Sequence, residues 1–257
     1  MRILGIDTAT LTASVALIED GTIVAEQFSE PRDRLTNAAI VQPRSNHAEV
    51  ILPLIESLLK EARCKLGDLS GFAISIGPGS FTGLRTGLST LKGLAYGGAI
   101  PVVGVSTLLA NAARAISYEG LVCSFLNARK SEVYAALFRK QGDVLDRITE
   151  EVAAPASVII EKVASVDAAA PCLFLGDGVT AYSDLIRTHF ESMARLETGE
   201  GYPSMASAVA HLSVGRFEAL NNMSLGGMVP TYLSAPECEK KVRREAQAVE
   251  IPSVAFR

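Results

Sequence analysis

Residues 77–87, GPGSFTGLRTG, join an apolar run over residues 72–76 to a helix-like run that ends at Tyr96. This order predicts a strand, a tight turn and a helix. Pro78 fixes its own backbone φ angle, the glycines admit conformations and close contacts that a Cβ atom would block, and Ser80 can cap the helix through its hydroxyl.

The turn itself has two interpretations. Backbone amides at a helix N-terminus can bind an anion, which makes Gly77 and Gly79 candidate contacts for a nucleotide phosphate. Alternatively, the glycines only allow the helix to pack closely on the sheet. A Walker-type loop is excluded, because no Lys-Ser or Lys-Thr pair follows the last glycine at the required spacing.

The composition is that of a globular protein. Of the 257 residues, 48% are hydrophobic and 20% are charged, which excludes a disordered chain. No apolar run reaches the ~18 residues that a membrane span needs. Residues 1–7 carry one basic residue and then alternate into a strand, unlike a signal peptide, so we expect a cytoplasmic protein without membrane association.

Charge and metal-binding residue types limit the possible ligands. The net charge of −4 disfavours an independent nucleic-acid-binding protein, and only Arg129, Lys130 and the cluster at 240–244 favour direct RNA binding. The four cysteines form no Cys-x-x-Cys pair, and the three histidines are far apart in sequence. These patterns fit neither a zinc site nor a disulfide scaffold, so we expect no metal site and reduced, buried cysteines.

Asp7 stands at the end of the first predicted strand and is followed by small and hydroxylated residues. Such an aspartate can hold a metal-bound water or a phosphate, or it can cap the turn with its own side chain. The local sequence favours the cap.

Two helices are predicted around the opening stretch, over residues 45–62 and 80–96. In the first, apolar residues fall on one stripe that has Pro53 inside it and His47 one turn before it. A lone histidine at such a position is more often half-buried than a ligand. The second helix has an apolar face and a face with almost no side chains, made by Gly83, Gly87 and Thr90, which permits close approach of another helix or a sheet.

The order of elements recurs along the chain. A three-stranded meander over residues 2–28, with Asp20-Gly21 as a hairpin turn, precedes the opening stretch. From residue 121 the series begins again, because Asn127-Ala128-Arg129-Lys130 parallels Asp7-Thr8-Ala9-Thr10 and residues 174–178 echo 75–79. The repeat predicts two βββαβα-type halves related by duplication. The boundaries expected are 1–116 for the first half, 117–225 for the second half and 226–257 for a C-terminal tail.

This pattern resembles the duplicated actin/hexokinase/heat-shock-ATPase-like (ribonuclease H-like) fold of the α/β class, with the second half reduced. Several motifs resemble the bacterial TsaB (YeaZ) family more closely: residues 3–10, 47–61, 77–87, 104–108 and 127–134, and, more weakly, Pro230-Thr231-Tyr232-Leu233. The resemblance implies a non-catalytic partner of TsaD in making threonylcarbamoyladenosine on tRNA.

The resemblance also implies that catalysis has been lost. Thr107 and Asn111 align with the His-x-x-x-His pair that holds the metal in TsaD, and neither replaces an imidazole well. Asn127 stands where an acidic residue is expected near the nucleotide, and Tyr182 where an asparagine contacts adenosine. We therefore predict no cofactor for the isolated chain and expect ATP and metal on partner subunits.

The resemblance implies that the two helices over 45–62 and 80–96 dock on TsaD in a four-helix contact. It also implies that the same surface forms a homodimer when TsaD is absent. A TsaE-like ATPase joins the assembly, and tRNA is reached only through the complex. The residues predicted for the partner interface are His47, Val50, Ile51, Leu54, Gly83, Leu84, Gly87, Thr90 and Leu91.

The alternative is a small kinase or nucleotide hydrolase of the same fold, in which Asp7 orients a magnesium-bound water near the turn at residues 77–79. A metalloprotease is excluded, since no His-Glu-x-x-His or equivalent cluster occurs. The substitutions at Thr107, Asn111 and Asn127 favour a structural and partner-docking role for the opening stretch.

Overall fold

The computed structural model describes residues 1–29, 47–129, 131–167, 170–217 and 227–233. The predicted loop over 30–44, Lys130 and the cluster at 240–244 lie outside these residues. The first half forms a five-stranded sheet in the order β3-β2-β1-β4-β5. Its elements are β1 (Arg2–Asp7), β2 (Ser14–Glu19), β3 (Thr22–Phe28), α1 (His47–Glu61), β4 (Gly71–Gly77), α2 (Phe81–Gly98), β5 (Val102–Ser106) and α3 (Thr107–Ala113), with a short 3₁₀ turn, η2, at Leu66–Asp68.

The second half repeats this plan in a six-stranded sheet with the path β11-β10-β6-β7-β8, and β9 also pairs with β7. The predicted duplication is therefore confirmed, because β6, β7, β8, β10 and β11 occupy the places of β1, β2, β3, β4 and β5. Its elements are β6 (Gly120–Arg129), β7 (Glu132–Gln141), β8 (Val144–Arg147), β9 (Val152–Pro155), α4 (Ala156–Val166), β10 (Cys172–Leu175), α5 (Val179–Phe190), η3 (Glu191–Met193), β11 (Ala194–Glu197) and α6 (Met205–Phe217).

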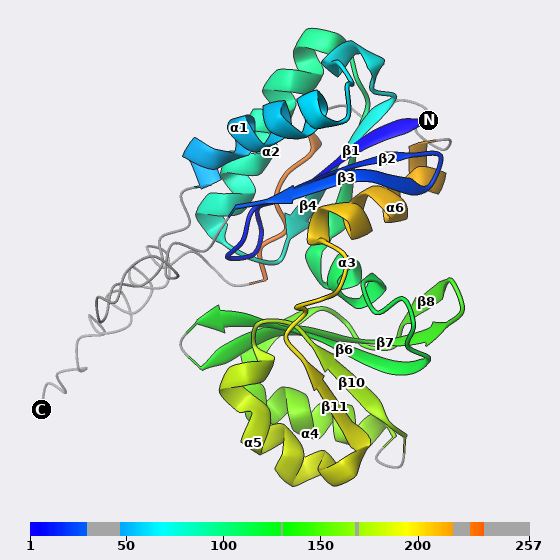
Figure 1. Cartoon of the computed structure of the whole chain (residues 1–257). Coiled ribbons are helices and arrows are strands. Elements are labelled where there is room, and N and C mark those ends of the chain that lie inside the picture. Colours follow the sequence, from blue (N-terminus) through cyan, green and yellow to red (C-terminus); the bar gives the residue numbers. More distant parts are fainter. Residues whose placement is uncertain (30–46, 130, 168–169, 218–226, 234–257) are drawn as a thin grey trace, which may run out of the picture.

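The last helix of the second half, α6, packs on the first sheet, and the last helix of the first half, α3, lies between the two sheets (Figure 1). Helices α1 and α2 cover one face of the first sheet, and α6 covers the opposite face. Helix α3 follows β5 in sequence, yet Leu108 and Ala112 pack with residues of the second sheet. The expected segment 117–225 therefore includes a helix, α6, that is part of the core of the first half.

Gly5 on β1 makes the packing of α6 possible. A Cβ atom at Gly5 would lie 2.1 Å from the carbonyl oxygen of Ala206 and 2.9 Å from the Cβ of Ala210. The amide of Ala206 also donates to the hydroxyl of Ser14 on β2, at 3.2 Å. The backbone of α6 thus lies directly on the first sheet.

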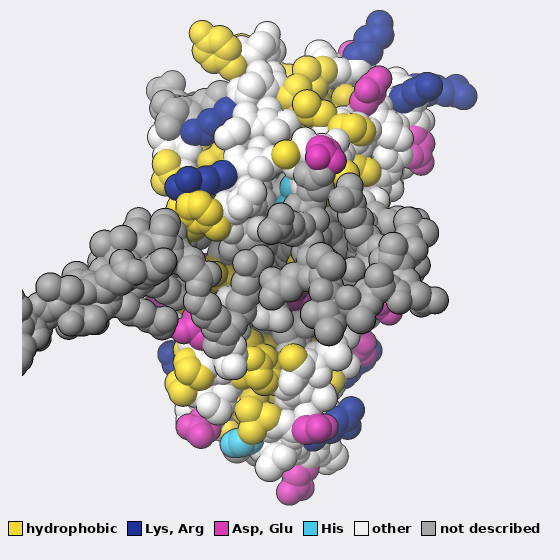
Figure 2. Space-filling model, turned by 90° about the vertical axis from the view of Figure 1, so that its left-hand side faces the viewer, with side chains coloured by type: hydrophobic (Ala, Val, Ile, Leu, Met, Phe, Trp, Pro, Cys, Tyr) yellow, Lys and Arg dark blue, Asp and Glu magenta, His cyan; other side chains and the backbone are white. Residues whose placement is uncertain are grey.

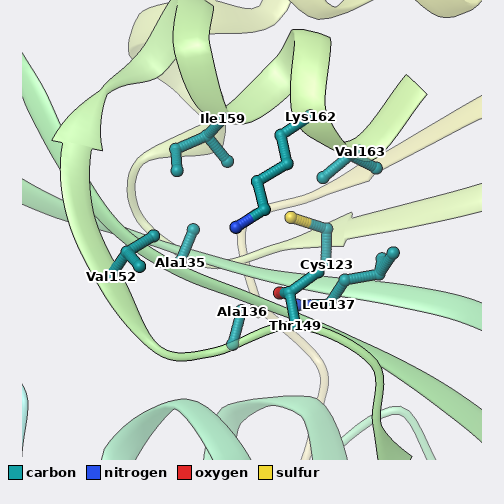
Figure 3. A pocket seen from close by; sticks show the side chains of 9 residues that line it. All are labelled: Cys123, Ala135, Ala136, Leu137, Thr149, Val152, Ile159, Lys162 and Val163. Atoms are coloured by element: carbon teal, nitrogen blue, oxygen red, sulfur yellow. The ribbon is translucent and has the colours of Figure 1, made fainter. Parts of the chain in front are cut away.

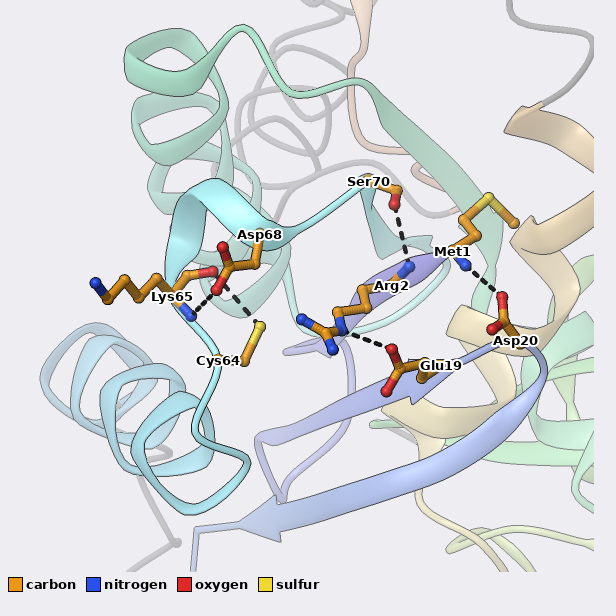
Figure 4. A network of polar contacts seen from close by, with 8 residues as sticks. All are labelled: Met1, Arg2, Glu19, Asp20, Cys64, Lys65, Asp68 and Ser70. Atoms are coloured by element: carbon orange, nitrogen blue, oxygen red, sulfur yellow. Dashed lines mark hydrogen bonds and ion pairs between the residues drawn. The ribbon is translucent and has the colours of Figure 1, made fainter.

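The hairpin turn predicted from the local sequence is present. Asp20 and Gly21 have φ angles of 48° and 79°, the left-handed pair that a two-residue hairpin turn requires. At the same end of the sheet the chain terminus is bound by polar contacts: the Met1 amino group pairs with Asp20, and Arg2 Nε donates to Glu19 at 2.8 Å (Figure 4). Both pairs are exposed and stabilise the fold little.

Helix α1 begins at His47 among the described residues and carries Pro53 in its interior rather than in its first turn.

Cys64, Cys123 and Cys172 are free and buried, as predicted, and burial raises the pKa of Cys172 to about 12. None of the described helices is long and apolar enough to span a membrane.

Candidate partner-docking surface and the turn beneath it

The opening stretch folds as predicted, with β4 ending at Gly77 and α2 beginning at Phe81. Ser80 caps α2, because its Oγ accepts a hydrogen bond from the amide of Gly83 at 3.2 Å. The amide of Ser80 donates to the carbonyl of Ala9 at 2.7 Å, which joins the turn to the end of β1. The Gly77–Pro78 peptide bond is cis.

Both glycines of the turn lie against backbone of the same chain. A Cβ atom at Gly77, whose φ is +117°, would lie 2.3 Å from the carbonyl oxygen of Thr231, and one at Gly79 would lie 2.4 Å from that of Ala9. Real Cβ atoms do not approach other atoms so closely. These contacts account for both glycines by packing alone, without a phosphate.

The glycines of α2 face the interior as well. A Cβ atom at Gly83 would lie 2.0 Å from the carbonyl oxygen of Thr8 and 2.7 Å from His47 Nδ1. At Gly87 it would lie 2.1 Å from Thr8 Oγ1. The interpretation that these two glycines make room for a partner helix is therefore wrong, since the first turn after β1 already fills that space.

Asp7 is fully buried and acts as the cap that its local sequence favours. Its Oδ2 accepts from the hydroxyl of Thr10 at 2.8 Å, and its Oδ1 lies 3.4 Å from the donating amide of Ala9. The carboxylate thus holds the turn that packs beneath α2.

His47, at the start of α1, is buried more deeply than the sequence predicts, with 3% of its surface exposed. Its Nε2 lies 3.4 Å from the carbonyl oxygen of Leu11, and its Nδ1 has no hydrogen-bond partner among the described residues. Burial lowers the pKa of His47, and the Leu11 carbonyl and the Asp7 carboxylate oppose this shift less strongly.

This lowered pKa predicts a loss of stability in mild acid. The unfolded chain takes up a proton near the ordinary histidine pKa of about 6.5, whereas the folded chain resists it, so stability falls as pH decreases from about 7 toward the folded pKa. We expect the urea midpoint to fall between about pH 7.5 and 5.5. His47→Gln should remove this part of the pH dependence, and His189→Gln, at an exposed position on α5, should retain it.

Asn111 joins the two halves instead of presenting a ligand. Its Nδ2 donates to Ser124 Oγ at 3.0 Å and to the carbonyl of Leu175 at 2.7 Å, and its Oδ1 accepts from Arg114 Nη1 at 3.1 Å. Thr107, one turn before it on α3, is fully buried, and its hydroxyl has no hydrogen-bond partner among the described residues. No group of three or more His, Cys, Asp or Glu side chains in the described part of the chain could hold a metal ion.

Asn127, which corresponds to Asp7 in the repeat, and Tyr182 both lie in the second half. The backbone N–H of Asn127 donates to Asp177 Oδ1 at 2.9 Å. The ring of Tyr182 packs edge-on against Phe125, with centroids 6.1 Å apart. Tyr182 therefore packs against an aromatic residue of the second core.

A small pocket, with room for about one water molecule, lies between α4 and the second sheet (Figure 3). Apolar side chains dominate its lining, and Lys162 extends into it from α4. A nucleotide needs a far larger site than this, since sites for drug-sized ligands usually measure about 300–1,000 Å³.

The outer face of α1 and α2 is exposed to solvent, whereas the turn beneath α2 is buried. Along α2, exposed positions follow helical spacing at Thr82, Ser89 and Gly93, and the Cβ position of Gly93 opens to solvent with no atom within 4 Å. The same two helices carry exposed apolar side chains, namely Leu52 on α1, which is 50% exposed, and Tyr96 on α2, which is 86% exposed. In Figure 2, hydrophobic side chains of the upper half lie among uncharged surface and several Lys, Arg, Asp and Glu side chains.

Comparison with known proteins identifies the family. The model of the family described as "TsaD: tRNA N6-adenosine threonylcarbamoyltransferase" matches residues 34–241. The "tRNA threonylcarbamoyladenosine biosynthesis protein TsaB" of Escherichia coli (strain K12) is 32% identical over 246 residues, which cover 94% of this chain and 98% of that protein. The chain belongs to the TsaB family.

Other TsaB-family proteins agree with this assignment over nearly the whole chain. The protein of the same description from Bacillus subtilis (strain 168) is 29% identical over 241 residues, covering 94% of this chain and 97% of that one. The solved structure "YeaZ from Pseudomonas aeruginosa" has a TM-score of 0.72 at 28% identity, and the match covers 90% of this chain and 99% of that one. The duplicated actin-like fold predicted from the sequence is thus confirmed for this TsaB-family chain.

Most of the predicted interface residues of this TsaB-family chain are interior. Six of the nine are buried, and only Val50, Leu54 and Thr90 are partly exposed. The apolar stripe of each helix faces the sheet, so the stripe marks the core. Leu52, Gly93 and Tyr96, which the prediction did not include, are exposed on the same helices, and helical spacing could have indicated this exposure. The six buried residues are His47, Ile51, Gly83, Leu84, Gly87 and Leu91.

Proposed function

We propose that this chain is the non-catalytic subunit of the complex that makes threonylcarbamoyladenosine on tRNA, and that it supports a TsaD-type catalytic subunit by binding it. The observation that carries the proposal is the match to the E. coli protein TsaB over 98% of its length, since that protein is named for this biosynthesis. ATP and metal then belong to the partner subunits, a TsaE-like ATPase joins the assembly, and tRNA is bound only through the complex.

A non-catalytic role is supported by the surroundings of the polar residues that an enzyme of this fold would use. The side-chain amide of Asn111 already donates two hydrogen bonds to the second half, and its oxygen accepts one from Arg114. Asp7 bonds to Thr10 and is closed off from solvent. The alternative, a small kinase or nucleotide hydrolase, needs Asp7 and the turn at 77–79 to reach a nucleotide, and titration of the isolated chain with ATP and magnesium distinguishes the two functions.

The outer face of α1 and α2 is the surface that best fits the catalytic subunit. Small residues at Thr82, Ser89 and Gly93 permit a helix of the partner to approach closely, and Leu52 and Tyr96 supply apolar area. The same face is the contact for a homodimer when the catalytic subunit is absent.

The decisive experiment is reconstitution with the cognate TsaD-type and TsaE-type subunits. We expect threonylcarbamoyladenosine formation on tRNA to require this chain. Full activity without it would overturn the proposed function, and tight ATP binding by the isolated chain would favour the alternative.

A bulky residue at Gly93 is expected to prevent docking while the fold remains intact. Because the Cβ position opens to solvent, Gly93→Arg should melt within a few degrees of the wild type, yet bind the catalytic subunit at least about tenfold more weakly. Gly215→Arg is the matched control, since Gly215 is an equally open, exposed glycine on α6. Equal binding by both variants would place the interface elsewhere.

A further inference from the structure

The segment 228–233 returns from the C-terminal part of the chain to the opening stretch. The amide of Thr231 donates to the carbonyl of Ile76, the residue before Gly77, at 2.6 Å. Met228 is 7% exposed and packs in the core under α1 and α2. These contacts hold the segment over the turn that begins α2 and bring Tyr232 to the helix.

Tyr232 and Phe81 fix the guanidinium of Arg85 on the surface of α2. The two rings have centroids 5.0 Å apart, and the Cζ of Arg85 lies 4.0 Å from the centroid of Phe81. Arg85 Nε donates to Tyr232 Oη at 3.0 Å. Arg85 is exposed, yet its side chain is positioned by one stacking contact and one hydrogen bond.

The outer edge of this guanidinium is unused within the described residues. The salt bridges among them include none to Arg85, and its one side-chain hydrogen bond uses Nε. No residue in the described part of the chain therefore occupies the two terminal amino groups. A guanidinium offers a planar pair of donors that matches a carboxylate, and positioning it beforehand reduces the entropy lost on binding.

We propose that Arg85 binds a carboxylate side chain of the catalytic subunit, with Phe81 and Tyr232 as the positioning residues that hold the guanidinium in place. This inference rests on the proposed function, because it extends the docking face of α1 and α2: Arg85 lies between Thr82 and Ser89 at helical spacing. Exposed aromatic and arginine side chains together are typical of the residues that dominate binding energy in protein interfaces.

A protein carboxylate fits this site better than a phosphate of tRNA. The chain has a net charge of −4, and nucleic-acid surfaces use several clustered cations. On the exposed face of α2, Thr82 and Ser89 border Arg85 and carry no charge, and the other cation of this helix, Lys92, lies two turns away and is only partly exposed.

The test measures binding of the full chain to the cognate TsaD-type subunit in the absence of tRNA, at several salt concentrations. Arg85→Ala should weaken binding about tenfold or more and reduce its dependence on salt. Arg85→Lys, which retains the charge but loses the planar fork, should bind with intermediate affinity, and Tyr232→Phe should show a smaller loss. Arg187→Ala, an exposed arginine on α5, is the control, and melting temperatures show that each variant folds.

Each outcome supports or overturns the proposal. Equal affinity of Arg85→Ala and wild type overturns it and leaves the proposed function intact. A weaker complex with unchanged salt dependence shows that Arg85 acts only through the fold of the segment, and a loss seen only with tRNA present assigns the site to a phosphate; both overturn it. If the wild-type chain does not bind at all, the proposed function fails together with this inference.

Discussion

Replacing Gly83 by valine is expected to leave the chain insoluble, or folded with a melting temperature lower by about 10 °C or more. A Cβ atom at this position would lie 2.0 Å from the carbonyl oxygen of Thr8, which is backbone held between β1 and the Ser80 turn. The helix and the first turn cannot separate without exposing the core beneath α2. We expect the substitution to lower the free energy of unfolding by more than about 3 kcal/mol, a large part of the roughly 5–15 kcal/mol that stabilises a typical domain.

Gly93→Val provides the matched control for Gly83→Val on the same helix. Its Cβ meets no atom within 4 Å, and valine in an exposed helix position costs less than about 1 kcal/mol relative to alanine. Thermal melting of both purified variants checks the prediction. If Gly83→Val melts close to Gly93→Val, the packing of α2 on the turn after β1 is not as described.

Asn111→Ala is expected to destabilise the chain by about 2–4 kcal/mol, measured as a shift of the urea midpoint. The substitution leaves the carbonyl of Leu175 and one amino group of Arg114 without their present partners, in the layer where the halves meet. Because the two bonds to Ser124 and Leu175 cross from α3 to β6 and β10, the loss weakens the contact between the halves.

Thr107→Val is the contrasting variant for Asn111→Ala on α3. The hydroxyl of Thr107 is buried without a hydrogen-bond partner in the described part of the chain, so its removal at constant shape should be neutral or stabilising. A large loss of stability for Thr107→Val would indicate a polar contact that the described residues do not supply.

The parts of the fold that the sequence predicted correctly depend on neighbouring residues. Ser80 caps α2 through an amide three positions away, Asp20-Gly21 closes a hairpin, and Asp7 caps its own turn. The duplication was also visible, because Gly142 with a φ of +57° ends β7 as Gly21 ends β2. In each case the physical cause lies within a few residues of the signal.

The parts that could not be predicted depend on residues far apart in sequence. An apolar stripe on a helix has the same spacing whether it faces a sheet or a partner, so the stripe on α1 was assigned to the interface although Ile51 is buried in the core. The glycines of α2 indicate that another group packs closely against the helix, but they do not show that this group is Thr8. Arg85 and Tyr232 are 147 residues apart, and no local pattern connects them.

The position of α6 on the first sheet has a consequence for how the chain is made. The amide of Ala206 bonds to Ser14 across 192 residues, so the face of the first sheet that α6 covers must wait for the helix during synthesis. At about 5–20 residues per second, the ribosome needs roughly 10–40 s to add that length. Ile3, Ala73 and Val103, once made, lack their final cover until α6 emerges, so we expect chaperones to bind the nascent N-terminal half.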